Sequence, residues 1–205
     1  NTVVLVQTQL GHGETQTALA LAAFGGGSMA AALLLPKLLE RIPDRPAMIA
    51  GAGMLTIGTA LGPLIGSLPA LMALWLLIGF GYSLTQTPTG RLLRRSAHPE
   101  DRPAIFAAQF ALSHACWLIT YPLAGRFGAG FGPDATFLLM AGIAAIGVIA
   151  AMRLWPANLA DDVAHDHSGL PPDHPHLRAH GAMGHHHALV IDDLHRSWPR
   201  PAETP

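Results

Sequence analysis

Histidines are concentrated at the C-terminal end of the chain. Nine of the twelve lie in residues 157–205, among Pro, Gly and Asp. Imidazole nitrogens bind Zn, Ni, Cu and Co, and close spacing along a flexible chain lets several of them reach one ion. The candidate metal ligands are His165, His167, His174, His176, His180, His185, His186 and His187. We therefore predict labile binding of Ni, Co or Zn on this tail, with no required cofactor; a merely hydrophilic low-complexity tail is the alternative.

The sequence of the tail also predicts little regular structure. It has little apolar periodicity, which is typical of a segment that is disordered without a ligand. Residues 189–195 are the one stretch with apolar content, enough for a short ordered patch that docks on the membrane domain. No spacing in the tail matches a closed structural zinc site.

A second set of polar side chains lies inside long apolar stretches. Polar groups are costly in hydrocarbon unless they face a partner or a water-filled cavity, so they indicate which helix faces line a path. The predicted substrate path comprises Tyr82, Gln86, Gln109, Ser113, His114 and Cys116. All except His114 fall in two narrow helical arcs at 100° per residue, one arc in each of two apolar stretches.

His114 lies on a different face, about 140° around the helix from Gln109, with Tyr121 on its own side. Two interpretations are open. Imidazole changes charge near neutral pH, so His114 is either a proton-titrating or cation-contacting group, or a neutral histidine hydrogen-bonded to an adjacent span.

The elements that carry these residues are those of a membrane protein. The 205 residues are 50% hydrophobic and only 12% charged, against about 25% charged in soluble domains. Residues 47–90 contain no Asp, Glu, Lys, Arg or His, whereas one helix crosses a bilayer with about 20 residues. A water-soluble fold is therefore excluded. The net charge of −1 gives no indication of nucleic-acid binding.

Uncharged runs predict the membrane spans of an all-α protein. A partial span ends near Leu10, and five full spans follow at residues 15–35, 47–65, 69–90, 103–125 and 135–152. The chain is expected to be a fragment that begins inside a span. We divide it into a transmembrane bundle, residues 1–155, and a histidine-rich tail, residues 156–205.

Basic residues predict the orientation of the spans. Seven of them mark the connections on one side, and only Arg126 marks the opposite side. Short loops rich in Lys and Arg stay in the cytoplasm, so these connections and the C-terminal tail are predicted to be cytoplasmic. Glycines at four-residue spacing, Gly58, Gly62 and Gly66, and the run of residues 25–28 predict close helix packing.

The sequence resembles the C-terminal half of a major facilitator superfamily transporter over residues 1–155. The loop of residues 36–45 is similar to the second copy of the family's G-x-L-a-D-R-x-G-R-R loop, with Glu40 and Arg41 at its acidic–basic pair and Arg45 at its last basic position. Both glycines of that loop are replaced by proline here. The third helix of each three-helix repeat in the family faces outward, which matches the apolar third and sixth spans.

The resemblance implies a six-helix half of a transporter with its first helix truncated, and a missing N-terminal six-helix half as partner. Glu40, Arg41 and Arg45 would then form charge pairs that favour one gating state. The histidine-rich tail is also similar to that of the nickel and cobalt resistance exporters of the superfamily. The expected function is alternating-access export of a small solute or divalent metal ion, in a bacterial inner membrane.

Three other classes of membrane protein share some of these sequence features. An intramembrane serine protease would need Ser28 and His114, but no oxyanion donor can be named, so we predict no enzyme activity. A cation diffusion facilitator also combines six spans with a histidine-rich segment, but it needs carboxylates that these spans lack. A non-transporting membrane anchor that displays a metal-binding tail is the third alternative. The lipid bilayer is the expected partner in every case.

Overall fold

The computed structural model of the protein describes residues 2–155, 162–165, 167, 169–171, 173–180 and 185–198; for residues 162–165, 180, 185 and 186 only the backbone is described. Contacts between Cα atoms divide the chain into two units. We call them the helical unit, Asn1–Gly90 with Phe110–Ala157, and the tail unit, Arg91–Gln109 with Asn158–Pro205.

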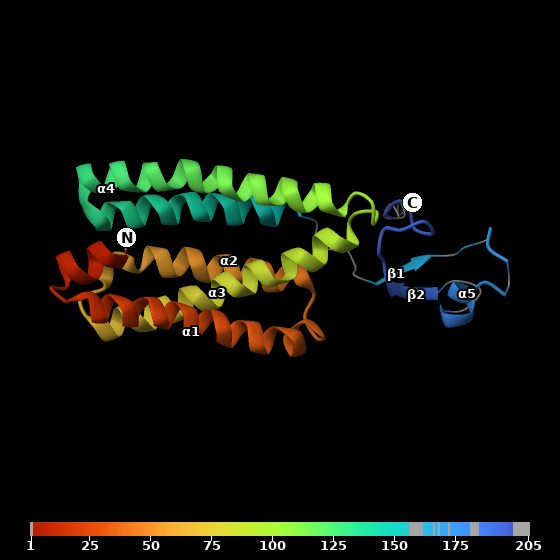
Figure 1. Cartoon of the computed structure of the whole chain (residues 1–205), viewed down its shortest axis with the longest axis horizontal. Helices are drawn as coiled ribbons and strands as arrows, with labels where there is room; N and C mark the ends of the chain where they lie inside the picture. Colours follow the sequence, from red (N-terminus) through yellow and green to blue (C-terminus); the bar gives the residue numbers. More distant parts are fainter. Residues whose placement is uncertain are drawn as a thin grey trace. The chain divides into compact units, whose positions relative to one another are not determined.

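Long helices account for most of the first 155 residues (Figure 1). In chain order the elements are the π-helix η1 (Val4–Gln9), α1 (Glu14–Leu39), α2 (Asp44–Ala60), the 3-10 turn η2 (Gly62–Leu64), α3 (Leu68–Arg95) and α4 (Arg102–Leu154). By length and composition, α1, α3 and α4 are able to cross a membrane. The prediction of a mainly helical protein with membrane-spanning helices therefore agrees with the structure.

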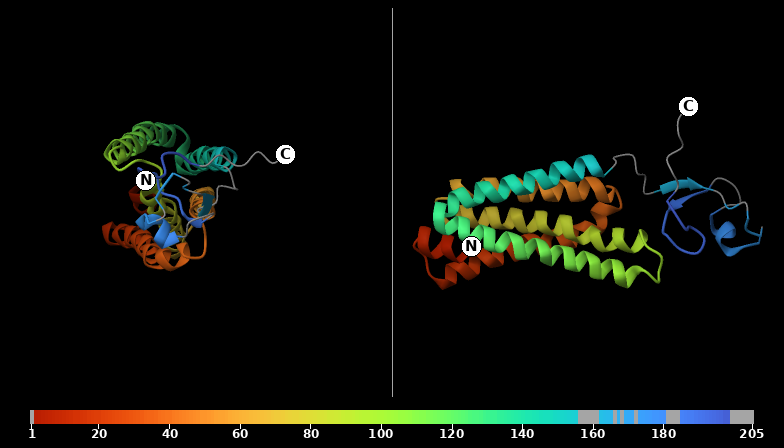
Figure 2. Two further views of the ribbon diagram at one scale, coloured as in Figure 1. Left: turned by 90° about the vertical axis from the view of Figure 1, so that its right-hand side faces the viewer. Right: turned by 90° about the horizontal axis from the view of Figure 1, so that it is seen from above.

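Two predicted spans share the 53-residue helix α4, which is interrupted at Gly132. Gly132 has a φ of 81° and a ψ of 171°. Glycine adopts this backbone conformation readily because glycine has no Cβ atom. Pro133 follows, and its fixed φ suits the first turn of a helix. From Phe110 onward the chain runs along one half of α4, turns at Gly132 and returns antiparallel along the other half (Figure 2).

Glycines let α3 pack closely against two other helices. A Cβ atom on Gly27 of α1 would overlap the carbonyl oxygen of Leu76, and one on Gly79 of α3 would overlap the carbonyl oxygen of Phe24. Two residues further along α3, a Cβ on Gly81 would lie 2.9 Å from the carbonyl oxygen of Gly51 in α2. Gly79 thus faces α1 while Gly81 faces α2.

The glycine prediction is confirmed at three positions, and at three others the described residues provide no neighbouring helix. A Cβ on Gly58 would lie 2.6 Å from Cγ1 of Ile78, and Gly62 packs against the ring of Phe137. Gly27 packs as described above. In contrast, a Cβ on Gly25, Gly26 or Gly66 would meet nothing within 4 Å. Spacing alone does not say which side of a helix meets its neighbour.

Serine side chains add one polar contact between α1 and α3. The hydroxyl oxygens of Ser28 and Ser83 are 2.7 Å apart, and Ser83 is buried. Ser28 is therefore a packing residue with a serine partner on another helix, which is the arrangement expected of polar groups between membrane helices.

The tail is more ordered than its sequence predicts. Strand β1 (Asp162–His165) pairs antiparallel with β2 (His185–Ala188), with Asp162 opposite Ala188, and α5 (Pro175–His180) lies between them in sequence. The prediction of a disordered tail is therefore wrong for these residues. The physical reason is a small apolar core, because Leu177, Leu189 and Ile191 are all buried.

Candidate functional site

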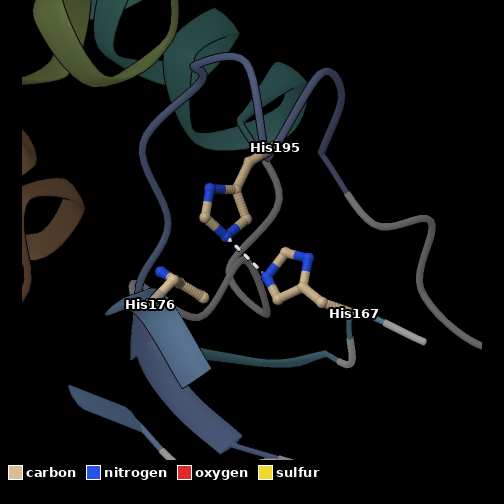
Figure 3. A group of neighbouring side chains, drawn as sticks. All are labelled: His167, His176 and His195. Carbon is tan, nitrogen blue, oxygen red and sulfur yellow. Dashed lines mark hydrogen bonds between the residues drawn. The ribbon is translucent and has the colours of Figure 1, made fainter. Parts of the chain in front are cut away.

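Three tail histidines converge on one point (Figure 3). His167 follows β1, His176 lies in α5 and His195 follows β2. One ring nitrogen from each of the three lies within 4.8 Å of those of the other two. The shortest separation is 3.1 Å, between Nε2 of His167 and Nε2 of His195. Three separate segments thus bring imidazole nitrogens to a common centre.

A fourth imidazole borders this group. The ring centroid of His187, in β2, lies 5.1 Å from that of His176 and 5.0 Å from that of His195. We call His167, His176, His187 and His195 the histidine cluster. His174 is a neighbour, and its Nδ1 accepts the backbone N–H of His176 at 3.3 Å.

Asp192 holds His195 in place. One carboxylate oxygen, Oδ1, accepts the backbone N–H groups of Leu194 and His195 and lies 2.9 Å from Nδ1 of His195. This is the Asx turn that Asp favours, extended by a side-chain contact. Burial acts to raise the pKa of Asp192, but the hydrogen bonds from the backbone and ring of His195 outweigh it, so the pKa lies below its usual value.

The structure describes the side-chain positions of only part of the predicted metal-ligand set, and metal binding stays a prediction. His167, His176 and His187 lie in the cluster, and His174 lies beside it. The side chains of His165, His180, His185 and His186 lie outside the described residues. His195 was not among the predicted ligands. The sequence signal for His195 is Asp192, which precedes it by three residues in the apolar stretch 189–195. A carboxylate at this spacing can orient the imidazole.

The tail stretch 189–198 contacts the connection between α3 and α4. The backbone N–H of Ile191 donates to the carbonyl oxygen of Arg95 at 2.9 Å, and Asp193 lies 3.0 Å from Nε2 of His98. The guanidinium of Arg95 lies 5.1 Å from the ring centroid of Trp198. All of these residues belong to the tail unit. The predicted ordered patch is therefore present, and these contacts reach the end of α3.

The predicted substrate-path residues lie on α3 and α4. Tyr82 and Gln86 are exposed on α3, and the Tyr82 ring is 5.8 Å from that of Phe24. On α4, Gln109 and Ser113 are half-buried. Cys116 is exposed. The role of these five residues in a substrate path stays a prediction.

His114 has a partner in its own helix. Its Nδ1 lies 2.8 Å from the carbonyl oxygen of Phe110, one turn earlier in α4. Its ring also lies in a row of aromatic side chains, 3.8 Å from Phe110 and 4.8 Å from Trp117, and Trp117 stacks on Tyr121. The observed hydrogen bond is thus within α4, whereas the interpretation as a neutral histidine assumed a partner in an adjacent span.

Two apolar cavities within the helical unit were not predicted. One of about 480 Å³ is lined by residues of η1, α2, α3 and both halves of α4, among them Thr59, Trp75 and Phe137. A second of about 420 Å³ shares Ala124 and Met140 with the first and extends to Thr120 and Tyr121. Apolar hollows of this size with a few polar groups are typical of small-molecule sites. The second cavity reaches the aromatic row of His114 at Tyr121.

The predicted gating residues lie at one end of the helical unit. Glu40 and Arg41 are exposed between α1 and α2. Arg45, near the start of α2, donates from Nε to the carbonyl oxygen of Trp155 and from Nη2 to that of Met152. Arg45 therefore binds the C-terminal carbonyls of α4, where a cation also complements the helix dipole.

These apolar helices and their close glycine contacts define a multi-pass helical membrane protein. A family model described as Major Facilitator Superfamily matches residues 1–189, and the chain belongs to that family. It is also similar to two uncharacterized MFS-type transporters from two strains of Mycobacterium tuberculosis. Each is 26% identical over 157 residues, which are 75% of this chain but 37% of the relative.

Membership of this family confirms the resemblance seen in the sequence at the level of the superfamily. It also confirms that the chain is not an enzyme, since the family and the matched relatives are transporters. The chain spans little more than a third of the length of those relatives.

Proposed function

We propose that the chain forms part of a secondary active transporter that moves a small solute across a membrane by alternating access. The observation that carries this proposal is the family match over residues 1–189. The close packing of α3 against α1 and α2 at glycines supports it, because a helical unit packed in this way can move as one body.

The chain supplies the C-terminal six-helix half of that transporter. In this arrangement η1 continues a first span, α1, α2 and α3 form three more, and the two halves of α4 form the last two. A preceding six-helix half is the partner, and the solute path runs between the halves. The 37% coverage of the relatives is consistent with this division. Tyr82, Gln86 and the polar face of α4 line the path.

The membrane is a bacterial inner membrane, and the tail faces the cytoplasm. The charge asymmetry of the connections supports this orientation. The bonds from Arg45 to Met152 and Trp155 place the basic α1–α2 connection at the same end of the helical unit as the end of α4. Glu40, Arg41 and Arg45 act there in gating.

The cargo is a small solute or a divalent metal ion, and the direction is export. The histidine-rich tail supports a metal cargo of the nickel and cobalt type, because imidazoles near a pore entrance would collect such ions. The apolar cavities support an organic solute instead. Both cargoes use the same path and are separated by one transport assay.

That assay uses inverted membrane vesicles that contain the complete transporter. Energised vesicles are offered radioactive nickel or cobalt in one arm and a fluorescent organic cation in the other. The variant Gln86→Ala, in the polar face of α3, is compared with Thr87→Ala, an exposed neighbour outside that face. We expect accumulation of one cargo, lowered by the first variant alone.

Two results would overturn the proposal. One is that the wild-type protein, present in the membrane, moves neither class of solute in either direction. The other is that the two variants lower transport equally, because the predicted path would then have no special role for the polar face of α3.

A further inference from the structure

Three imidazoles from different segments lie near the geometry of a metal site. Tetrahedral zinc holds nitrogen ligands at about 2.0–2.1 Å, so two ligand nitrogens on one ion lie about 3.4 Å apart. Nε2 of His167 and Nε2 of His195 are already 3.1 Å apart, and the widest separation in the set is below 4.8 Å. Separations between the nitrogens therefore have to shorten by at most about 1.4 Å to reach the spacing of a tetrahedral site.

The environment of His195 suits a metal ligand. His195 is 7% exposed, and its Nδ1 faces the carboxylate of Asp192 at 2.9 Å. A proton on Nδ1 leaves Nε2 as a lone-pair donor that points to the centre of the cluster. A carboxylate behind a histidine in this way is the usual arrangement at protein metal sites.

The nitrogen ligands of the cluster determine which metal ions it would bind. Uncharged nitrogen ligands suit Zn²⁺, Ni²⁺, Co²⁺ and Cu²⁺, whereas Mg²⁺ and Ca²⁺ require oxygen ligands. His187 lies close enough, at ring distances of 5.0 and 5.1 Å, to supply a fourth nitrogen after a change of rotamer.

The same stretch of chain joins the cluster to the end of α3. His195 lies between Ile191, whose N–H binds the carbonyl of Arg95, and Trp198, whose ring lies over the Arg95 guanidinium. Asp193 contacts His98 in the α3–α4 connection. A metal ion that holds His195 would therefore restrict the whole stretch 189–198 against residues 95–98.

We propose that His167, His176 and His195 bind one divalent transition-metal ion, with Asp192 as a positioning residue, and that the bound ion fastens the stretch 189–198 to the connection between α3 and α4. Metal loading then changes the freedom of a connection between two helices. The link to transport rests on the proposed function, whereas the metal site and its contact with the connection do not.

The test is a titration of the complete purified transporter in detergent with Co²⁺, whose visible absorption reports four-coordinate nitrogen ligation. The variant His167→Ala/His176→Ala/His195→Ala is compared with His180→Ala/His185→Ala/His186→Ala, which removes the same number of tail histidines. We expect one ion per chain with a four-coordinate spectrum in the wild type and in the control, and loss of that spectrum in the cluster variant.

Hydrogen–deuterium exchange in the same samples tests the link to α3. We expect Zn²⁺ to slow exchange in peptides covering 189–198 and 95–101, and the cluster variant to abolish both effects. Equal loss of binding in the two triple variants, or retention of the spectrum in the cluster variant, overturns the metal site. Protection confined to the tail overturns the fastening of the connection. Neither result depends on whether the protein moves a solute, so failure of the transport proposal is recognised separately.

Discussion

Adjacent glycines in α1 offer a direct test of the helix packing. A Cβ on Gly27 would overlap the carbonyl oxygen of Leu76 and lie 2.8 Å from its carbonyl carbon, while a Cβ on Gly26 would meet nothing within 4 Å. The substitutions Gly26→Ala and Gly27→Ala therefore each add one Cβ atom to α1. Only the second one introduces that atom between α1 and α3.

The expected magnitude follows from these contacts. Alanine stabilises a helix interior over glycine by about 0.5–1 kcal/mol, and this gain is common to both variants. Ordinary carbon contacts lie at about 3.5–4.0 Å, so Gly27→Ala requires α1 and α3 to separate by more than about 1 Å, which forfeits about half or more of the attraction of each contact. Overpacking of this kind costs about 1–3 kcal/mol. We therefore expect Gly27→Ala to be less stable than Gly26→Ala by about 1–3 kcal/mol.

The measurement is the free energy of unfolding in mixed micelles, followed by far-ultraviolet circular dichroism as the fraction of denaturing detergent rises. Gly79→Ala, which approaches Phe24 from the α3 side, serves as an independent copy of the perturbation and is expected to behave like Gly27→Ala. Equal stability of Gly26→Ala and Gly27→Ala would refute the close approach of α1 and α3 at this point.

Three further outcomes are expected. A double-mutant cycle of Ser28→Ala and Ser83→Ala should give a coupling of about 0.6 kcal/mol, as is usual for polar contacts between membrane helices, and zero coupling would contradict the 2.7 Å contact. Arg45→Ala should lower the free energy of unfolding by about 0.3–1 kcal/mol at low salt through loss of its contacts with the α4 carbonyls, an effect that should shrink at high salt and be smaller in Arg45→Lys. Asp192→Asn should weaken Co²⁺ binding about 10–100-fold, whereas Asp193→Asn, whose carboxylate is exposed and contacts His98, should leave it unchanged; equal effects would exclude a special role for Asp192.

The helices could be located from the sequence because their signal is local. Every full span predicted from an uncharged run overlaps an observed helix. The prediction succeeds because the ability of a segment to cross the hydrocarbon depends on its own length and composition. The turn at Gly132 also falls between the last two predicted spans. The span at residues 47–65 was too long by several residues because the chain leaves the helix after Ala60 for the turn Gly62–Leu64.

The packing contacts were only partly predictable. Small residues at helical spacing indicate that some face of a helix can approach a neighbour, but adjacent positions such as Gly26 and Gly27 are equivalent in composition. The rotation of α1 against α3 decides that Gly27 is the contact. Gly79 and Gly81, which face two different helices, carry no four-residue spacing and were not predicted.

Membrane insertion, the helical class and the family resemblance were determined by the sequence alone, because each depends on residue types summed over a segment, whereas metal binding by the tail stays a prediction. The tertiary structure decided which side chains meet. His167 and His195 are 28 residues apart in sequence yet 3.1 Å apart in space. Such a contact depends on how β1, α5 and β2 pack around a few buried side chains, and no local pattern records the outcome of that packing.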